Sequence, residues 1–201
     1  SFDLFLLARW TGASAVGYYA LGKELANMPV EKISTVVNDV SLPAYAALAR
    51  DRSEAARLLT ETLRMHAVVG FPVFWGLAAI AGVAVPVLFG ERWTPAVFAL
   101  VALSLVAPLR LLFTLVLRAL GLRWSDVARV VRGAALAAAL MASLVALVAR
   151  GHAAEPSVTS LVLLVVLGGV AYPALLRYLD PATFGLVRTR TFRLAGLRPQ
   201  P

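Results

Sequence analysis

The sequence predicts an all-α, polytopic membrane helical bundle with about five to six transmembrane helices. Of its 201 residues, 60% are hydrophobic and only 15% are charged, whereas a soluble domain has about 45–50% apolar and about 25% charged residues. The apolar residues also gather in long, nearly uncharged runs, and the cationic residues stand mostly at the ends of those runs. A soluble core of this size cannot hide so much apolar surface.

The first third of the chain is expected to hold two helical regions. A short apolar helix over 2–10 carries Asp3 and Arg9, and Thr11-Gly12 ends it. A longer helical region over 13–48 follows, in which Pro29 begins the second piece. No cleavable signal peptide is expected, because no basic segment opens the chain and no A-x-A site follows an apolar run.

The second piece of that region carries a polar stripe. Its polar residues recur at three- and four-residue spacing and therefore share one helix face. They are Glu31, Ser34, Thr35, Asn38, Ser41 and Tyr45. Because unpaired polar groups in hydrocarbon cost several kcal/mol each, roughly, such a stripe has to face protein or a water-filled cavity. We therefore expect this helix to line a cavity in a membrane transporter.

The rest of the chain predicts four more helices. Asp51 and Glu54 have the spacing of a capping box before the first of them, and Pro72 is expected to kink it. The turn at Gly90 to Trp93 separates it from the next helix, and a basic loop and a short loop separate the remaining ones. The expected ranges are 53–89, 95–120, 125–149 and 157–179.

Charge sets the expected orientation. Segments 49–64, 118–132 and 177–198 hold most of the arginines, whereas 90–95 and 150–156 hold few. Since basic loops stay on the cytoplasmic side, the bundle over 1–187 is expected to place its C-terminus there, followed by a basic cytoplasmic tail over 188–201. The same distribution explains the net charge of +8 without nucleic acid, for which no reading motif is present.

Several motifs along the chain resemble one family. Residues 3–51 read DLFLLARWTGASAVGYYALGKELANMPVEKISTVVNDVSLPAYAALARD, and FP, FGERW, ALG and GGVAY follow at 71–72, 89–93, 119–121 and 168–172. The positions that fit the family's order are Asp3, Gly12, Gly17, Tyr19, Pro29, Pro43 and Asp51. This pattern resembles the Wzx-type oligosaccharide flippases of the multidrug/oligosaccharidyl-lipid/polysaccharide exporter superfamily, similar to the colanic-acid exporters.

The resemblance implies one lobe of a MOP/MATE-like transporter. Family members have two pseudo-symmetric bundles, and this chain resembles the C-terminal one, with an apparent internal deletion after the ALG motif. The implied function is flipping of undecaprenyl-pyrophosphate-linked oligosaccharide repeat units across the bacterial inner membrane, for lipopolysaccharide or exopolysaccharide. The implied partners are the bilayer, the lipid-linked oligosaccharide, a second lobe or copy, and the polysaccharide polymerase machinery. The alternative is a truncated, non-transporting remnant or subunit.

An anionic, hydrated substrate head requires cations and hydrogen-bonding groups within the bilayer. The substrate-binding candidates are Arg110, Arg9, Lys23 and Lys32, with Asn38, Asp39 and Tyr45 as polar partners. Arg110 is the most specific, because it stands inside an apolar run with no charged residue within seven positions on either side. The same isolation is also expected of an arginine near the membrane surface whose side chain reaches up to water, or of one that forms a structural pair with Asp39.

Simpler interpretations exist for the other cations. Lys23 and Lys32 stand beside Glu24 and Glu31, as in interfacial charge pairs, and Arg9 can pair with Asp3 at a helix end.

Enzymatic classes receive little support. The chain has no cysteine, and His66 and His152 have no metal-ligand spacing. No HExxH, GxSxG or Walker A motif is present. A membrane-embedded glycosyl- or acyltransferase would need an acidic or histidine cluster, which the sequence does not supply. We therefore expect no catalytic residue, metal or cofactor.

Overall fold

The computed structural model describes residues 12–48, 52–118, 124–152 and 155–186, and over these it is helical without a strand. The elements are α2 (Ala13–Leu48), α3 (Arg52–Phe89), a short 3-10 helix (Glu91–Trp93), α4 (Ala96–Arg118), α5 (Trp124–His152) and α6 (Val158–Leu179). The all-α prediction is confirmed. The expected helix at 2–10 and the basic tail at 188–201 lie outside the described residues, and the division into bundle and tail stays a prediction.

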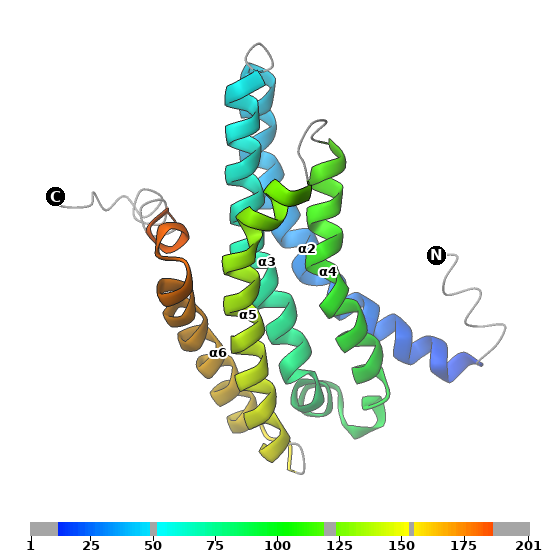
Figure 1. The fold of residues 1–201 in the computed structure, drawn as a ribbon. Helices are drawn as coiled ribbons and strands as arrows, with labels where there is room; N and C mark the ends of the chain where they lie inside the picture. Colours follow the sequence, from blue (N-terminus) through cyan, green and yellow to red (C-terminus); the bar gives the residue numbers. More distant parts are fainter. Residues whose placement is uncertain (1–11, 49–51, 119–123, 153–154, 187–201) are drawn as a thin grey trace.

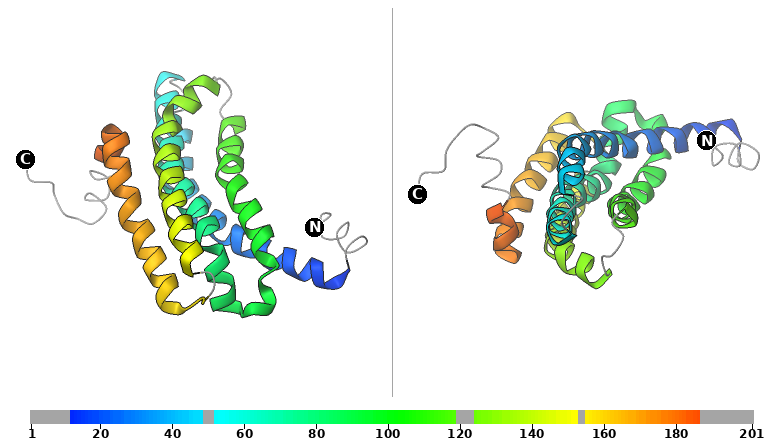
Figure 2. Two further views of the ribbon diagram at one scale, coloured as in Figure 1. Left: turned by 60° about the horizontal axis from the view of Figure 1, so that its bottom comes forward. Right: turned by 90° about the horizontal axis from the view of Figure 1, so that it is seen from above.

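Helix α3 forms the centre of the bundle. It packs against α2, α4, α5 and α6, and Figure 1 shows it between α5 and α4, with α6 on the far side of α5. The first half of α2 extends sideways from the bundle, which the view from above also shows (Figure 2). The second half of α2 runs beside the beginning of α3. Because α2 is helical without a break from Ala13 to Leu48, Pro29 lies inside a single helix rather than at the start of one.

Small side chains let α5 approach the centre closely. Ala134, Ala137 and Ala138 are at most 1% exposed and belong to the apolar cluster that joins α3, α5 and α6 around Phe71. In lipid, helices gain stability from close packing rather than from leaving water, so alanine is favoured where two backbones approach. The alanine-rich composition of α5 thus explains why it packs so extensively on α3.

A glycine permits the crossing of α2 and α4. A Cβ atom added to Gly22 would lie 2.8 Å from the backbone nitrogen of Leu100 and 2.9 Å from the Cβ of Ala99. Only glycine fits without a shift of the backbone at this point. The close contact at Gly22 therefore fixes the point along α4 at which the first half of α2 crosses it.

Prolines also lie inside α3, α4 and α6, at Pro72, Pro86, Pro108 and Pro173. A proline has no N–H, so it leaves the carbonyl four residues earlier without its usual helical donor. For Pro72 this carbonyl belongs to Val68, and the hydroxyl of Tyr172 in α6 donates a hydrogen bond of 2.8 Å to it. The interruption that Pro72 makes in α3 is thus satisfied from another helix, as buried carbonyls in lipid require.

Three of the described helices can cross a membrane by length and composition. They are Thr60–Phe89, Val127–His152 and Val158–Leu179, and Ala96–Arg110 is a shorter apolar segment. The shortest of the three has 22 residues, which span about 33 Å and exceed a hydrocarbon core of about 30 Å. The protein is therefore a multi-pass membrane protein. The total of five to six spans stays a prediction.

Candidate functional site

Arg110 lies on the outward face of α4. Its side chain is exposed, and so are Val106, Leu109 and Phe113 around it. The opposite face of α4, with Ser104, Pro108 and Leu112, is buried against the bundle.

Its depth follows from its position in the helix. Arg110 comes fourteen residues after Ala96, where α4 begins, and eight residues before Arg118, where α4 ends. These separations are about 21 Å and about 12 Å along the helix axis. An arginine at that depth among lipid-facing side chains is costly unless protein or water covers it. The face around Arg110 is therefore suited to line a polar cavity or an interface with another helix. The pairing of Arg110 with Asp39 stays untested, because the Asp39 side chain lies outside the described ones.

Lys23 lies near the crossing of α2 and α4. Its side chain is half-buried, and its Nζ stands 5.9 Å from the centre of the Tyr19 ring, within cation–π range. Lys23 follows Gly22, which contacts Leu100, and Arg110 lies ten residues or about 15 Å further along α4. The structure therefore places Lys23 and Arg110 at different depths along α4.

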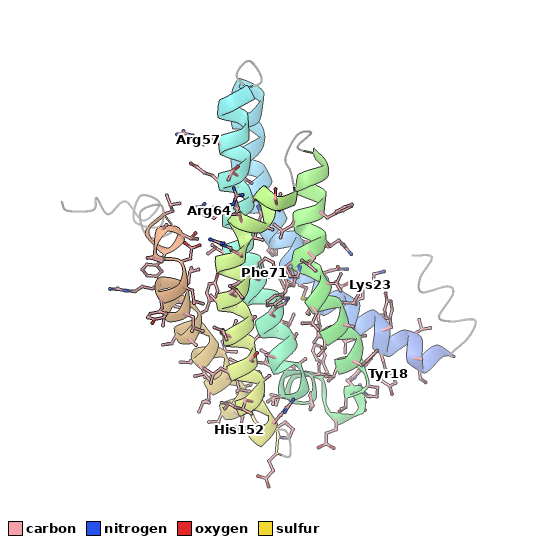
Figure 3. The ribbon with its side chains drawn as sticks, viewed as in Figure 1. Tyr18, Lys23, Arg57, Arg64, Phe71 and His152 are labelled. Atoms are coloured by element: carbon pink, nitrogen blue, oxygen red, sulfur yellow. The ribbon has the colours of Figure 1, made fainter. Side chains whose placement is uncertain are left out.

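The end of α2 where Lys23 lies is rich in interfacial groups. Tyr18 packs edge-on against Trp93, with ring centres 5.8 Å apart, and Arg92 lies over the same Trp93 ring at 5.7 Å. Figure 3 shows Tyr18 and Lys23 on the first half of α2. Aromatic and cationic side chains of this kind gather at membrane–water boundaries.

The other predicted site residues lie along α2 or before it. Lys32 is exposed on α2. Asn38, Asp39 and Tyr45 lie further along the same helix, but their side chains are outside the described ones. Arg9 lies outside the described residues. The convergence of these groups on one cavity stays a prediction.

The structure adds an apolar cavity that sequence reasoning missed. It has a volume of about 380 Å³ and lies between α2, α3, α5 and α6. Its walls include Pro29, Pro72, Gly76, Met141, Gly168 and Tyr172. Such walls accept hydrocarbon but offer few partners to a hydrated sugar, so this cavity is unsuited to a saccharide head. Glycines at helical contacts were its only sequence signal.

A second pocket lies at the end of the bundle where α3 begins. It also has a volume of about 380 Å³, and its walls are Arg57, Thr60, Glu61 and Arg64 of α3 together with Leu186. Both arginines belong to the basic segment 49–64, but the sequence analysis did not identify them as a site. Their seven-residue spacing, which puts both on one helix face, was the available signal.

Both histidines bond to the backbone of their own helix. The Nδ1 atom of His66 lies 3.0 Å from the carbonyl oxygen of Thr62, and that of His152 lies 3.0 Å from the carbonyl oxygen of Val148. Across the described part of the chain, no three histidine, cysteine, aspartate or glutamate side chains lie together as a metal site would require.

In a comparison with known proteins, the first half of the chain matches one protein family. The family described as "Polysaccharide biosynthesis protein" matches residues 1–98, so Arg57 and Arg64 lie inside the matched segment and Arg110 beyond it. No solved structure matches the chain.

Three relatives have names that agree with this family. The chain is 34% identical over 110 residues to the teichuronic acid biosynthesis protein TuaB of Bacillus subtilis, covering 55% of this chain and 23% of that protein. It is 30% identical over 105 residues to the lipopolysaccharide biosynthesis protein WzxC of Escherichia coli, covering 52% and 21%. It is 30% identical over 103 residues to the succinoglycan biosynthesis transport protein ExoT of Rhizobium meliloti, covering 50% and 21%.

The matched segment thus spans less than a quarter of each relative. Within that segment, the resemblance that the sequence motifs indicated is confirmed. Through residues 1–98, this chain is similar to the family of polysaccharide biosynthesis proteins.

Proposed function

We propose that this chain forms one lobe of a transporter that flips undecaprenyl-pyrophosphate-linked oligosaccharide repeat units across the bacterial inner membrane. The relatives named for teichuronic acid, lipopolysaccharide and succinoglycan biosynthesis support a role in surface polysaccharide formation. Transport requires no covalent chemistry, so the proposal needs neither a catalytic residue nor a cofactor.

The observation that carries the proposal is the exposure of Arg110 on an apolar face of α4. A guanidinium binds phosphate through two parallel hydrogen bonds, and this interaction strengthens where water is scarce. In this proposal Arg110 holds the pyrophosphate while the sugar passes through the polar part of the cavity. Arg9, Lys23, Lys32, Asn38, Asp39 and Tyr45 are proposed as further cavity groups.

The proposed orientation follows from the two ends of the bundle. The end where α3 and α5 begin and α6 ends carries five described arginines, namely Arg57, Arg64, Arg129, Arg132 and Arg177. The positive-inside rule favours a cytoplasmic location for this end and for the C-terminus. The substrate would then enter from the end that holds the arginine-lined pocket.

A second lobe completes the cavity in this proposal. The outward face of α4 that carries Arg110 would face either that lobe or a second copy of the chain, and polymerase machinery would receive the product. The alternative is a non-transporting remnant or subunit. In that case the chain would be stable only together with a partner.

Substitution of Arg110 tests the transport proposal. In cells that depend on this protein for surface polysaccharide, we expect Arg110→Ala to lower export about tenfold or more, as loss of a charge-assisted hydrogen bond predicts. Arg110→Lys should restore part of it. The matched control is Arg150→Ala, an exposed arginine in the last turn of α5 at the opposite end. Normal export by Arg110→Ala at an unchanged membrane level would contradict the proposal.

The length of the gene product separates the two alternatives. A C-terminal tag at the native locus and an immunoblot of membranes would give a band near the 21.4 kDa of this chain or a much heavier one. A heavier band supports a transporter whose cavity is shared by two lobes. A band at the lower mass that sediments as a monomer and supports no export would favour the remnant.

A further inference from the structure

The arginine-lined pocket lies between α3 and the helical residues 181–186 that follow α6. Arg57 and Arg64 are seven residues apart in α3, so their side chains leave the same side of the helix about 10.5 Å apart along its axis. Thr60 and Glu61 lie between them, and Leu186 forms the opposite wall. Figure 3 shows both arginines on the part of α3 above Phe71, on the side where α6 lies.

The pocket lies at the depth of lipid headgroups. The charged residues of α3 end at Arg64, and residues 65–89 contain no Asp, Glu, Lys or Arg. Arg57 and Arg64 therefore both precede this uncharged run, and Arg57 is exposed whereas Arg64 is half-buried. Phosphate groups of a bilayer occupy this boundary between water and hydrocarbon. A basic pocket here is positioned to meet the phosphate of a lipid.

The charges of the pocket suit a single negative charge. Two guanidinium groups and the carboxylate of Glu61 give the walls a formal charge of +1 (2 − 1). A phosphodiester carries one negative charge and matches this value, whereas a pyrophosphate carries more and would suit a more basic site. The apolar wall at Leu186, and the exposed Tyr178 and Leu179 at the end of α6, provide surface for the attached acyl chains.

We propose that this pocket binds the phosphodiester headgroup of an anionic membrane phospholipid, with phosphatidylglycerol as the probe. Arg57 and Arg64 donate hydrogen bonds to the phosphate oxygens, and the bound lipid holds α3 to the end of α6. The anionic cytoplasmic leaflet attracts juxtamembrane basic groups in this way. The proposal rests on this pocket alone and holds whether or not the chain transports a saccharide.

Native mass spectrometry of the full chain in a neutral detergent provides the test. We expect phosphatidylglycerol to bind in preference to phosphatidylethanolamine of the same chain length. The double variant Arg57→Gln/Arg64→Gln should raise the half-saturating lipid concentration about fivefold for each arginine removed. The single variant Arg57→Gln changes only an exposed side chain and should give about one fivefold step, so the test does not depend on the fold of the double variant.

The matched control removes the same charge from the opposite end. Arg92 and Arg150 are both exposed there, and Arg92→Gln/Arg150→Gln should leave the binding curve unchanged. Equal weakening by the two double variants would overturn the proposal, because binding would then follow total charge. Equal binding of both phospholipids would overturn it as well. Displacement of phosphatidylglycerol by millimolar inorganic phosphate alone would assign the site to free phosphate rather than to a lipid.

Discussion

Helices α3 and α6 have the same mean hydropathy over their membrane-spanning parts, but their surroundings differ. In the most apolar 18-residue window of α3, 44% of the residues are buried inside the bundle, whereas in that of α6 only 11% are buried. Val162, Val166 and Val170 of α6 point outward at one-turn spacing and are more than half exposed. Hydropathy thus identifies a span without distinguishing a central helix from a peripheral one, because lipid tails are as apolar as the side chains of a core.

The largest expected difference between the two helices is in packing. Phe74 of α3 is fully buried and Val166 of α6 is 57% exposed. We expect Phe74→Ala to lower the free energy of unfolding by about 3–5 kcal/mol, because the lost contacts leave a cavity. Val166→Ala should change it by less than about 0.5 kcal/mol. Unfolding of the full chain in mixed micelles measures both. Similar losses for the two variants would mean that α6 is covered by protein.

The attachment of α6 at its end gives a smaller effect. A Cβ at Gly133 of α5 would overlap the side chain of Asp180, which accepts hydrogen bonds from the backbone N–H and the hydroxyl of Thr183. We expect Gly133→Ala to destabilise the protein by about 1–3 kcal/mol through overpacking. The control is Gly151→Ala in the same helix, where a Cβ meets nothing within 4 Å. If the two variants unfold alike, the contact between α5 and Asp180 is not fixed.

The bond between Tyr172 and Val68 gives the smallest effect and the sharpest test. Tyr172→Phe leaves the Val68 carbonyl without a donor, and we expect a loss of about 1 kcal/mol. Pro72→Ala supplies an N–H that can bond the same carbonyl within α3. In that background Tyr172→Phe should therefore have almost no effect, and a double-mutant cycle measures the difference. Tyr178→Phe, at an 88% exposed tyrosine of the same helix, is the control. Additive effects of the two changes would contradict the assignment.

The sequence predicted where each helix begins and ends better than it predicted which helices pack against each other. Helix limits could be read within a few residues, because Gly90 and the basic segments interrupt otherwise continuous apolar runs. The central place of α3 could not be read, since its packing depends on helices that are distant in the chain. The bond from Tyr172 to Val68 joins residues 104 positions apart, and no local pattern indicates it.

The candidate site was predicted less completely. Isolation of Arg110 in an apolar run predicted an unusual arginine, and the structure places its side chain on the exposed face of α4. Its role in substrate binding stays a prediction. The contact of Lys23 with the Tyr19 ring joins residues four positions apart in one helix, so the spacing could have indicated it. The pocket at Arg57 and Arg64 needed the position of Leu186, which only the fold supplies.

The proline in α3 also constrains how this sequence can change over generations. Pro72 is tolerated at little cost while a donor stands at position 172, because the Val68 carbonyl then has a partner. A tyrosine at 172 is compatible with a non-proline residue at 72. The tyrosine can therefore arise before the proline, whereas a proline that arises first would leave the Val68 carbonyl without a partner. Homologues that lack the proline should be free to lose the tyrosine, whereas those that keep the proline should retain a hydrogen-bond donor in α6. The pair at 72 and 172 should therefore be inherited together.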